Sequence, residues 1–223
     1  MNLPRQVKAV VFDMDGLLVD TETVVFAAMR QAAGEIGGEM PFQTFQRMVG
    51  LPHAASDPIL VEHFGKGFDL AAYSASVSRY FRAELAAGIA LKAGVVEILD
   101  ALDALDLPRA IATSSSREAV EQSLGPHGLL DRFGAFITRD VQGRGKPHPE
   151  PFLRAAAALC VAPQDCLALE DSHNGVRSAS AAEMMTVMVP DMLDPTEEMR
   201  TLTVRIARDL HEVRELLEGQ RRG

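Results

Sequence analysis

Short apolar runs alternate with helical segments along most of the chain beyond residue 90, and this alternation limits the fold more than any other feature. Five runs have the β-branched and aliphatic composition of buried strands: Val7–Phe12, Arg109–Ala112, Ala135–Thr138, Cys166–Leu169 and Met185–Val189. Helical patterns lie between or after them: Gly94–Leu105, Arg117–Leu124, Glu150–Cys160, His173–Ala182 and, at the end, about Leu210–Gln220. This order predicts an α/β fold with a parallel sheet, because parallel strands are usually joined by crossover helices.

Residues 18–87 break this alternation, because they contain helical patterns and no convincing strand. Ala-rich apolar stripes at helical spacing occur at Glu22–Ile36, Pro41–Val49, about Asp57–Phe64 and Leu70–Ala87. Some 70 residues is long for one crossover connection, so we expect a helical cap inserted into a core made of residues 1–17 and 88–223. The alternative is that these helices are crossover helices of the same domain.

Composition excludes several classes of partner. The formal net charge is −9 without a clustered basic face, so neither a nucleic acid nor an anionic membrane is expected to bind. No signal-peptide core opens the sequence and no run approaches about 18 apolar residues, which predicts a soluble, cytoplasmic protein. Cys160 and Cys166 lack zinc-ligand spacing and indicate buried thiols in a reducing compartment, with a disulfide as the alternative.

The first predicted strand ends in two carboxylates, Asp13 and Asp15, followed by Gly16. Like charges held this close repel, and removing each from water costs several kcal/mol unless a cation offsets it. A hard divalent cation such as Mg²⁺ prefers carboxylate and carbonyl oxygens and leaves positions open for a phosphate. The alternative is an Asx turn, in which Asp13 caps the strand end and Gly16 supplies a positive φ.

Polar residues also follow three other predicted strands, and the carboxyl ends of parallel strands line one crevice. Thr113–Ser116 precedes a helix whose free N–H groups suit an anion, although simple N-capping by a serine is the alternative. Lys146 lies between Gly145 and Pro147, and its positive charge suits a phosphate; the alternative is a solvated loop lysine. The Glu170–Asp171 pair adds a second acidic strand end, which makes Asp171 a metal-ligand candidate.

Together these four segments resemble the haloacid dehalogenase superfamily in its helical-cap branch. Asp13-Met14-Asp15-Gly16, Thr113-Ser114-Ser115, Gly145-Lys146-Pro147 and Glu170-Asp171-Ser172 stand in the order of that family. The resemblance covers nearly the whole chain. It implies a Rossmann-like core with a five-stranded sheet in the order 5-4-1-2-3, and a mobile cap over the active site.

The resemblance also implies a role for each motif residue. Asp13 is the expected nucleophile, Asp15 the general acid and then the general base, and Lys146 the cation that steadies nucleophile and phosphate. Phosphate binding is expected from Thr113, Ser114 and Lys146, with the hydroxyl role open between Thr113 and Ser114. Mg²⁺ is expected to bind Asp13, the Asp15 carbonyl and Asp171, with Glu170 just behind Asp171.

Asp15 favours phosphoryl transfer over dehalogenation, because an alkoxide leaving group needs a proton and a halide does not. The mutases of this branch carry a cap histidine where this chain has Val24, Val25 and Phe26, which favours hydrolysis. Arg47 and His53 fall near the expected substrate contacts of the cap, although a lone loop histidine is often a surface residue.

We therefore predict a Mg²⁺-dependent phosphatase, a phosphoric monoester hydrolase acting through an aspartyl-phosphate. Its expected substrate is a small phosphorylated metabolite of the sugar-phosphate or phosphoglycolate type. The alternatives are a sugar-phosphate mutase and a non-catalytic binding protein on the same fold. The expected assembly is a monomer or a weak homodimer.

Overall fold

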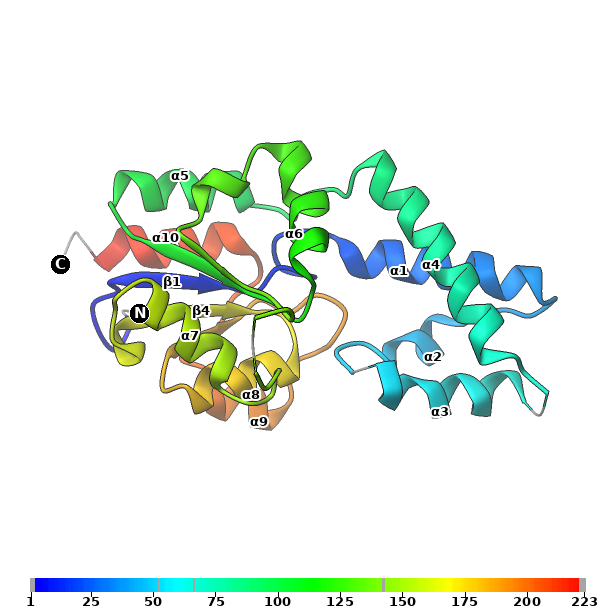
Figure 1. Cartoon of the computed structure of the whole chain (residues 1–223). Coiled ribbons are helices and arrows are strands. Elements are labelled where there is room, and N and C mark those ends of the chain that lie inside the picture. Colours follow the sequence, from blue (N-terminus) through cyan, green and yellow to red (C-terminus); the bar gives the residue numbers. More distant parts are fainter. Residues whose placement is uncertain (1–2, 52, 66, 142, 221–223) are drawn as a thin grey trace. The chain divides into compact units, whose positions relative to one another are not determined.

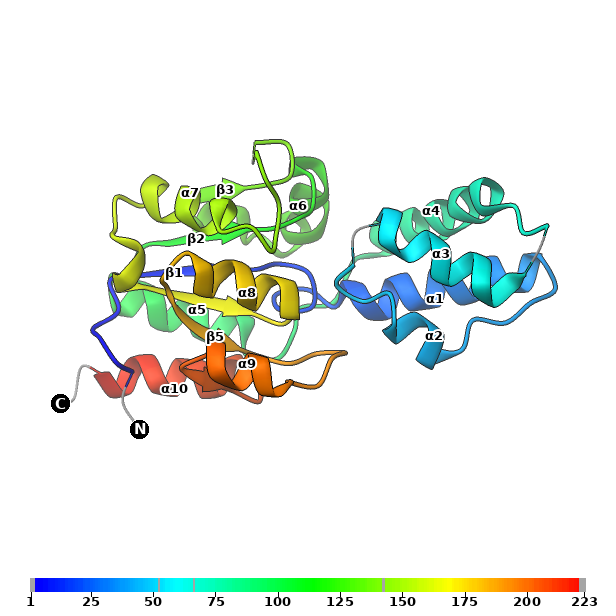
Figure 2. The ribbon, with the colours of Figure 1, turned by 90° about the horizontal axis from the view of Figure 1, so that it is seen from below.

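A computed structural model describes residues 3–51, 53–65, 67–141 and 143–220 (Figures 1 and 2). The chain divides into two compact units, one made of Met1–Val19 and Leu91–Gly223 and the other of Asp20–Ala90. The smaller unit thus begins two residues later and ends three residues later than the expected 18–87. That it acts as a cap stays a prediction.

The larger unit is built on a parallel sheet with the strand order β3-β2-β1-β4-β5-β6. The strands are β1 (Ala9–Phe12), β2 (Arg109–Ala112), β3 (Ala135–Ile137), β4 (Cys166–Glu170), β5 (Met185–Met188) and β6 (Arg205–Ile206). The predicted parallel α/β fold is confirmed, and its first five strands have the expected order. The expected count of five strands was wrong, because the described residues contain a sixth strand, β6. This strand is only two half-buried residues long and leaves no apolar run in the sequence.

Helices cover both faces of this sheet (Figure 1). They are α5 (Val95–Ala104), α6 (Arg117–Leu124), α7 (Glu150–Ala158), α8 (His173–Ala181), α9 (Glu197–Leu202) and α10 (Leu210–Gln220). Short 3₁₀ helices span Gly125–His127, Leu130–Arg132 and Pro163–Asp165. Helix α9 was not predicted, because its six residues are too few to show a helical period.

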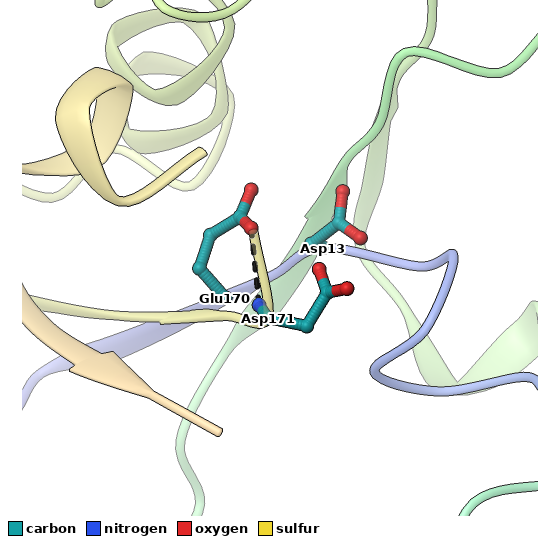
Figure 3. A group of neighbouring side chains, drawn as sticks. All are labelled: Asp13, Glu170 and Asp171. Atoms are coloured by element: carbon teal, nitrogen blue, oxygen red, sulfur yellow. Dashed lines mark hydrogen bonds between the residues drawn. The ribbon is translucent and has the colours of Figure 1, made fainter. Parts of the chain in front are cut away.

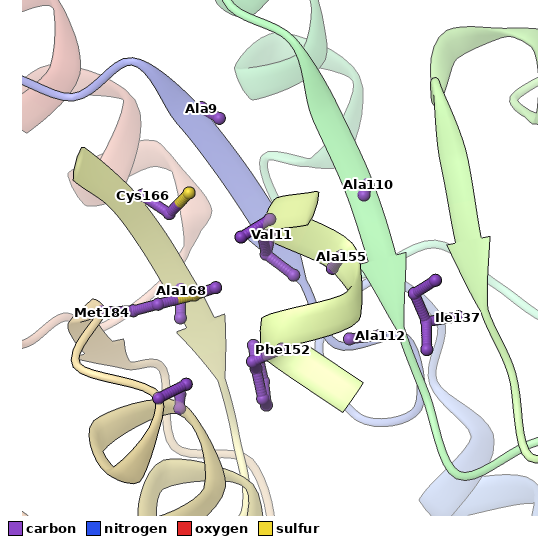
Figure 4. Close-up of a cluster of buried hydrophobic side chains, with 13 residues drawn as sticks. Ala9, Val11, Ala110, Ala112, Ile137, Phe152, Ala155, Cys166, Ala168 and Met184 are labelled. Atoms are coloured by element: carbon purple, nitrogen blue, oxygen red, sulfur yellow. The ribbon is translucent and has the colours of Figure 1, made fainter. Parts of the chain in front are cut away.

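Small side chains let helix α7 lie close against the sheet (Figure 4). Ala9 and Ala110 on the strands belong to one buried cluster with Ala155 and Phe152 on α7, and all four are fully buried. Close packing of this kind gives each buried atom many dispersion contacts. The resulting rigid core holds the carboxyl ends of β1, β2 and β4 in fixed positions at one edge.

The smaller unit is helical, as expected, with α1 (Thr21–Glu35), α2 (Phe42–Gln46), α3 (His53–Phe64) and α4 (Leu70–Ala87). Helix α3 begins four residues before the expected start and contains Pro58. Tyr73 on α4 is buried, and its hydroxyl donates to the carbonyl oxygen of Met29 on α1 at 3.0 Å. This bond joins α1 to α4, and burial raises the pKa of Tyr73.

One of the two cysteines, Cys160, differs from the expected buried thiol. Both are free thiols, and only Cys166 is buried, whereas Cys160 is exposed. Cys160 lies just beyond the end of α7 with a φ of 55°, at the kind of left-handed position that ends a helix at the surface. Among the described residues, no helix is long and apolar enough to cross a membrane.

Candidate active site

The carboxylate of Asp13 lies at the carboxyl end of β1. All four residues of that strand are buried, and the backbone N–H of Asp13 continues the ladder by donating to the carbonyl oxygen of Leu169 at 2.9 Å. Asp13 is itself only 5% exposed. The chain then turns at Gly16, whose φ of 82° suits glycine. A Cβ on Gly16 would lie 2.4 Å from Oδ2 of Asp171, so the missing side chain also lets two strand ends approach.

Lys146 connects two of the buried carboxylates. Its Nζ donates to Oδ1 of Asp13 and, at 2.5 Å, to Oε1 of Glu170, and its side chain is only 6% exposed. Burial opposes the charge of the lysine, but the Asp13 and Glu170 carboxylates outweigh that effect and raise the pKa of Lys146. The loop lysine is therefore a buried, charged member of the site and not a solvated surface residue.

Glu170, at the end of β4, is fully buried and fully engaged. Besides Lys146, its carboxylate accepts hydrogen bonds of 3.1 Å from the backbone N–H of Asp171 and from both the N–H and the hydroxyl of Ser172. Ser172 also caps helix α8 by accepting from the N–H of Gly175. A Cβ on Gly175 would lie 1.8 Å from the carboxyl carbon of Glu170, so glycine makes room for this carboxylate.

Asp13, Glu170 and Asp171 form a buried acidic trio (Figure 3). One oxygen from each lies within 4.8 Å of the others, and Figure 3 shows the carboxyl groups of Asp13 and Asp171 close to each other. Burial, followed by the negative charges of Glu170 and Asp15, raises the pKa of Asp13 well above its usual value despite Lys146. The trio brings three carboxylates together, and Lys146 contacts two of them, so a divalent cation fits the charge of this cluster.

The loop after β2 holds the carboxylate of Asp15. Oδ2 of Asp15 accepts a hydrogen bond from Oγ1 of Thr113 at 3.1 Å and another from Oγ of Ser115 at 2.7 Å. The N–H of Ser115 donates to Oγ1 of Thr113, which fixes the turn between the two hydroxyls. Ser116 caps helix α6 by accepting from the N–H of Ala119. One serine of the run is thus a helix cap, and two other residues contact Asp15.

Sequence reasoning missed the contact of Ser115 with Asp15. It proposed Thr113 and Ser114 for the phosphate, but the Ser114 side chain is exposed, while Thr113 and Ser115 are turned towards Asp15. The repeated serines were the available signal, and only the turn geometry separates them. The predicted binding of phosphate by Thr113 and by the Ser114 N–H stays a prediction.

The two substrate candidates of the smaller unit do not gain support. Arg47 is exposed and its guanidinium lies 2.6 Å from the carboxylate of Glu62. His53 is the first residue of α3, and its side chain lies outside the described residues. A substrate role for either residue stays a prediction.

A parallel sheet with a buried lysine–carboxylate centre at its carboxyl edge defines an α/β protein equipped for acid–base and nucleophilic chemistry. The model of the haloacid dehalogenase-like hydrolase family matches residues 7–183. The chain belongs to this family, so the resemblance noted in the sequence is confirmed.

Individual relatives extend the same comparison. A Drosophila melanogaster protein named "Probable pseudouridine-5'-phosphatase" is 36% identical over 196 residues, which cover 84% of this chain and 83% of that protein. The phosphorylated carbohydrates phosphatase of Thermotoga maritima is 32% identical over 176 residues, covering 78% of this chain and 81% of its own length. Among solved structures, a HAD family hydrolase from Deinococcus radiodurans R1 with bound phosphate and sodium has a TM-score of 0.82 and 25% identity, covering 96% of both chains.

Proposed function

We propose that this protein is a Mg²⁺-dependent phosphatase that hydrolyses a small phosphorylated metabolite through an aspartyl-phosphate on Asp13. The observation that carries the proposal is the contact of Lys146 with both Asp13 and Glu170, beside Asp171. A buried carboxylate next to a buried cation is a suitable nucleophile for phosphorus, because the positive charge of the cation offsets the negative charge of the incoming phosphate.

The proposed reaction has two displacements at phosphorus. In the first, a carboxylate oxygen of Asp13 attacks, the bond to the ester oxygen breaks, and Asp15 gives its proton to the departing alkoxide. In the second, Asp15 takes a proton from water, which attacks phosphorus, releases phosphate and restores the Asp13 carboxylate. The hydroxyls of Thr113 and Ser115 hold Asp15 for both proton transfers.

Asp13, Asp171 and the backbone carbonyl of Asp15 would hold the Mg²⁺. The excess of buried carboxylates over Lys146 supports this assignment, as does Gly16, which leaves space beside Oδ2 of Asp171. Bound there, the cation would neutralise negative charge on the phosphate and on the carboxylates. Lys146 supplies the rest of the positive charge at Asp13.

Sugar-type phosphates are the substrate class that the comparisons favour. Both relatives described above are named for phosphorylated carbohydrate or pseudouridine 5′-phosphate substrates. Helix α1 carries Val24, Val25 and Phe26, and none of these side chains has a proton to exchange with a sugar hydroxyl. Water is therefore the proposed acceptor, in preference to a second hydroxyl of the substrate.

Phosphate release from a panel of sugar phosphates, nucleoside 5′-phosphates and phosphoglycolate, with Mg²⁺ and with chelator, tests the proposal. We expect Mg²⁺-dependent release by the wild type, none by Asp13→Asn, and wild-type rates for Asp131→Asn, a control at an exposed aspartate. Turnover by a folded Asp13→Asn protein would refute the nucleophile. A sugar 1-phosphate that yields mainly its 6-phosphate would show a mutase instead.

A further inference from the structure

A further carboxylate lies beyond the end of β5, outside the four motifs at the other strand ends. Asp191 follows three residues after the last residue of that strand, and its side chain is 13% exposed. Lys92 Nζ lies 2.6 Å from Oδ1 of Asp191. The second oxygen, Oδ2, is buried and has no hydrogen-bond partner within the part of the chain that the structure describes. Half of a carboxylate is thus satisfied and the other half is not, which is costly unless a ligand completes it.

The unsatisfied oxygen borders the acidic trio. A Cβ built on Gly16 would lie 3.4 Å from Oδ2 of Asp191 and 2.4 Å from Oδ2 of Asp171. The two oxygens are therefore no further apart than the sum of those distances, and both face the space that Gly16 leaves open. Asp171 belongs to the trio, whereas Asp191 is not among the residues whose ligand atoms all lie within 4.8 Å of one another.

We propose that Asp191 is a positioning residue of the Mg²⁺ site, whose Oδ2 accepts a hydrogen bond from the hydration shell of the ion. Mg²⁺ gives up water reluctantly and keeps part of that shell in proteins, so it needs acceptors beyond its direct ligands. Such outer partners typically change metal affinity by 10–100-fold. This inference rests on the proposed function, because that function places the ion between Asp13 and Asp171.

Lys92 holds Asp191 in the orientation that the role requires. Its ammonium group donates to Oδ1 of Asp191, and its backbone N–H donates to the carbonyl oxygen of Leu18 at 3.0 Å, in the turn that follows Asp15. The lysine thereby links the loop after β5 to the loop after β1. The positive charge of Lys92 also offsets the negative charge of Asp191 as felt from a distance. The Asp191 carboxylate therefore contributes a directed hydrogen-bond acceptor to the site more than it contributes net charge.

Two variants that break the same ion pair separate this role from a structural one. We expect Asp191→Asn to weaken Mg²⁺ binding about tenfold, because a neutral amide oxygen is a weaker hydrogen-bond acceptor for the hydration shell than a carboxylate oxygen. Lys92→Met loses the ion pair but keeps the carboxylate and removes a positive charge, so its Mg²⁺ affinity should equal or exceed that of the wild type. If the ion pair only braced the loops, both variants would lose affinity alike.

Isothermal calorimetry with MgCl₂ measures the affinity directly and does not depend on turnover. Circular dichroism and the melting temperature in chelator confirm that each variant is folded, and Asp165→Asn, which breaks the surface pair with Lys8, controls for loss of one negative charge. The proposal stands only if Asp191→Asn loses more affinity than Lys92→Met and Asp165→Asn. Equal losses, or none, overturn it.

The proposed phosphatase activity fails in a different way. A wild type that binds Mg²⁺ but releases no phosphate would refute that activity and leave the role of Asp191 standing. A wild type that binds no Mg²⁺ would overturn both.

Discussion

Replacing Gly175 with alanine should damage the site more than its size suggests. A Cβ at this position would lie 1.8 Å from the carboxyl carbon of Glu170, which must move by about 1.6 Å to reach an ordinary 3.4 Å contact. Glu170 is fully buried and holds Lys146, two backbone N–H groups and one hydroxyl, so it has no free space to move into without losing some of them. Breaking a buried ion pair by removing one partner costs about 3–5 kcal/mol.

The expected loss is therefore about 3–5 kcal/mol of unfolding free energy, a large part of the roughly 5–15 kcal/mol typical of a folded protein. Gly219→Ala is the matched control, because it adds the same methyl group near the end of α10 with nothing within 4 Å. Alanine there should leave stability unchanged or raise it by up to about 1 kcal/mol.

Urea unfolding followed by circular dichroism compares the two variants with the wild type. A shift of the midpoint to lower urea at constant slope would show that Gly175→Ala acts on stability itself. Gly175→Ala with the midpoint of Gly219→Ala would refute the argument that Glu170 is fixed in place by its partners.

Three further measurements follow from the structure. Ser115→Ala should slow the hydrolysis of esters with poor leaving groups more than that of p-nitrophenyl phosphate. The reason is that Asp15 then loses the hydroxyl of Ser115 as a partner and protonates the leaving oxygen less effectively. An equal loss of rate on both substrates would argue against this role. Mg²⁺ should raise the melting temperature of the wild type by mass action, and Asp171→Ala should remove that rise; an unchanged rise in the variant would exclude Asp171 as a ligand. Cys160 should react quickly with a thiol reagent at pH 8, whereas Cys166 should react only after unfolding. Burial and then the charge of Asp165 raise the pKa of Cys166 to about 11. Rapid labelling of two thiols in the native protein would contradict the burial of Cys166.

Local pattern was enough to predict the sheet and the meeting of charged residues at its carboxyl edge. Strand and helix periods are properties of short segments, so the parallel α/β fold and the first five strands were readable from the chain. Because the carboxyl ends of parallel strands meet at one edge, the same pattern brought Asp13, Lys146 and Glu170 into one site without a structure. The two-residue strand β6 escaped, since its pairing with β5 is a property of the sheet and not of its own sequence.

The sequence by itself determined which residue types stand at each strand end, and therefore the family and the kind of chemistry. Only the tertiary structure decided which side chains meet. Ser115 contacts Asp15 where neighbouring serines do not, because a turn of a few residues sets the direction of each hydroxyl. Lys92 and Asp191 are 99 positions apart and form an ion pair because two loops are packed together. Such contacts depend on the paths of loops, which packing selects and which no local period records.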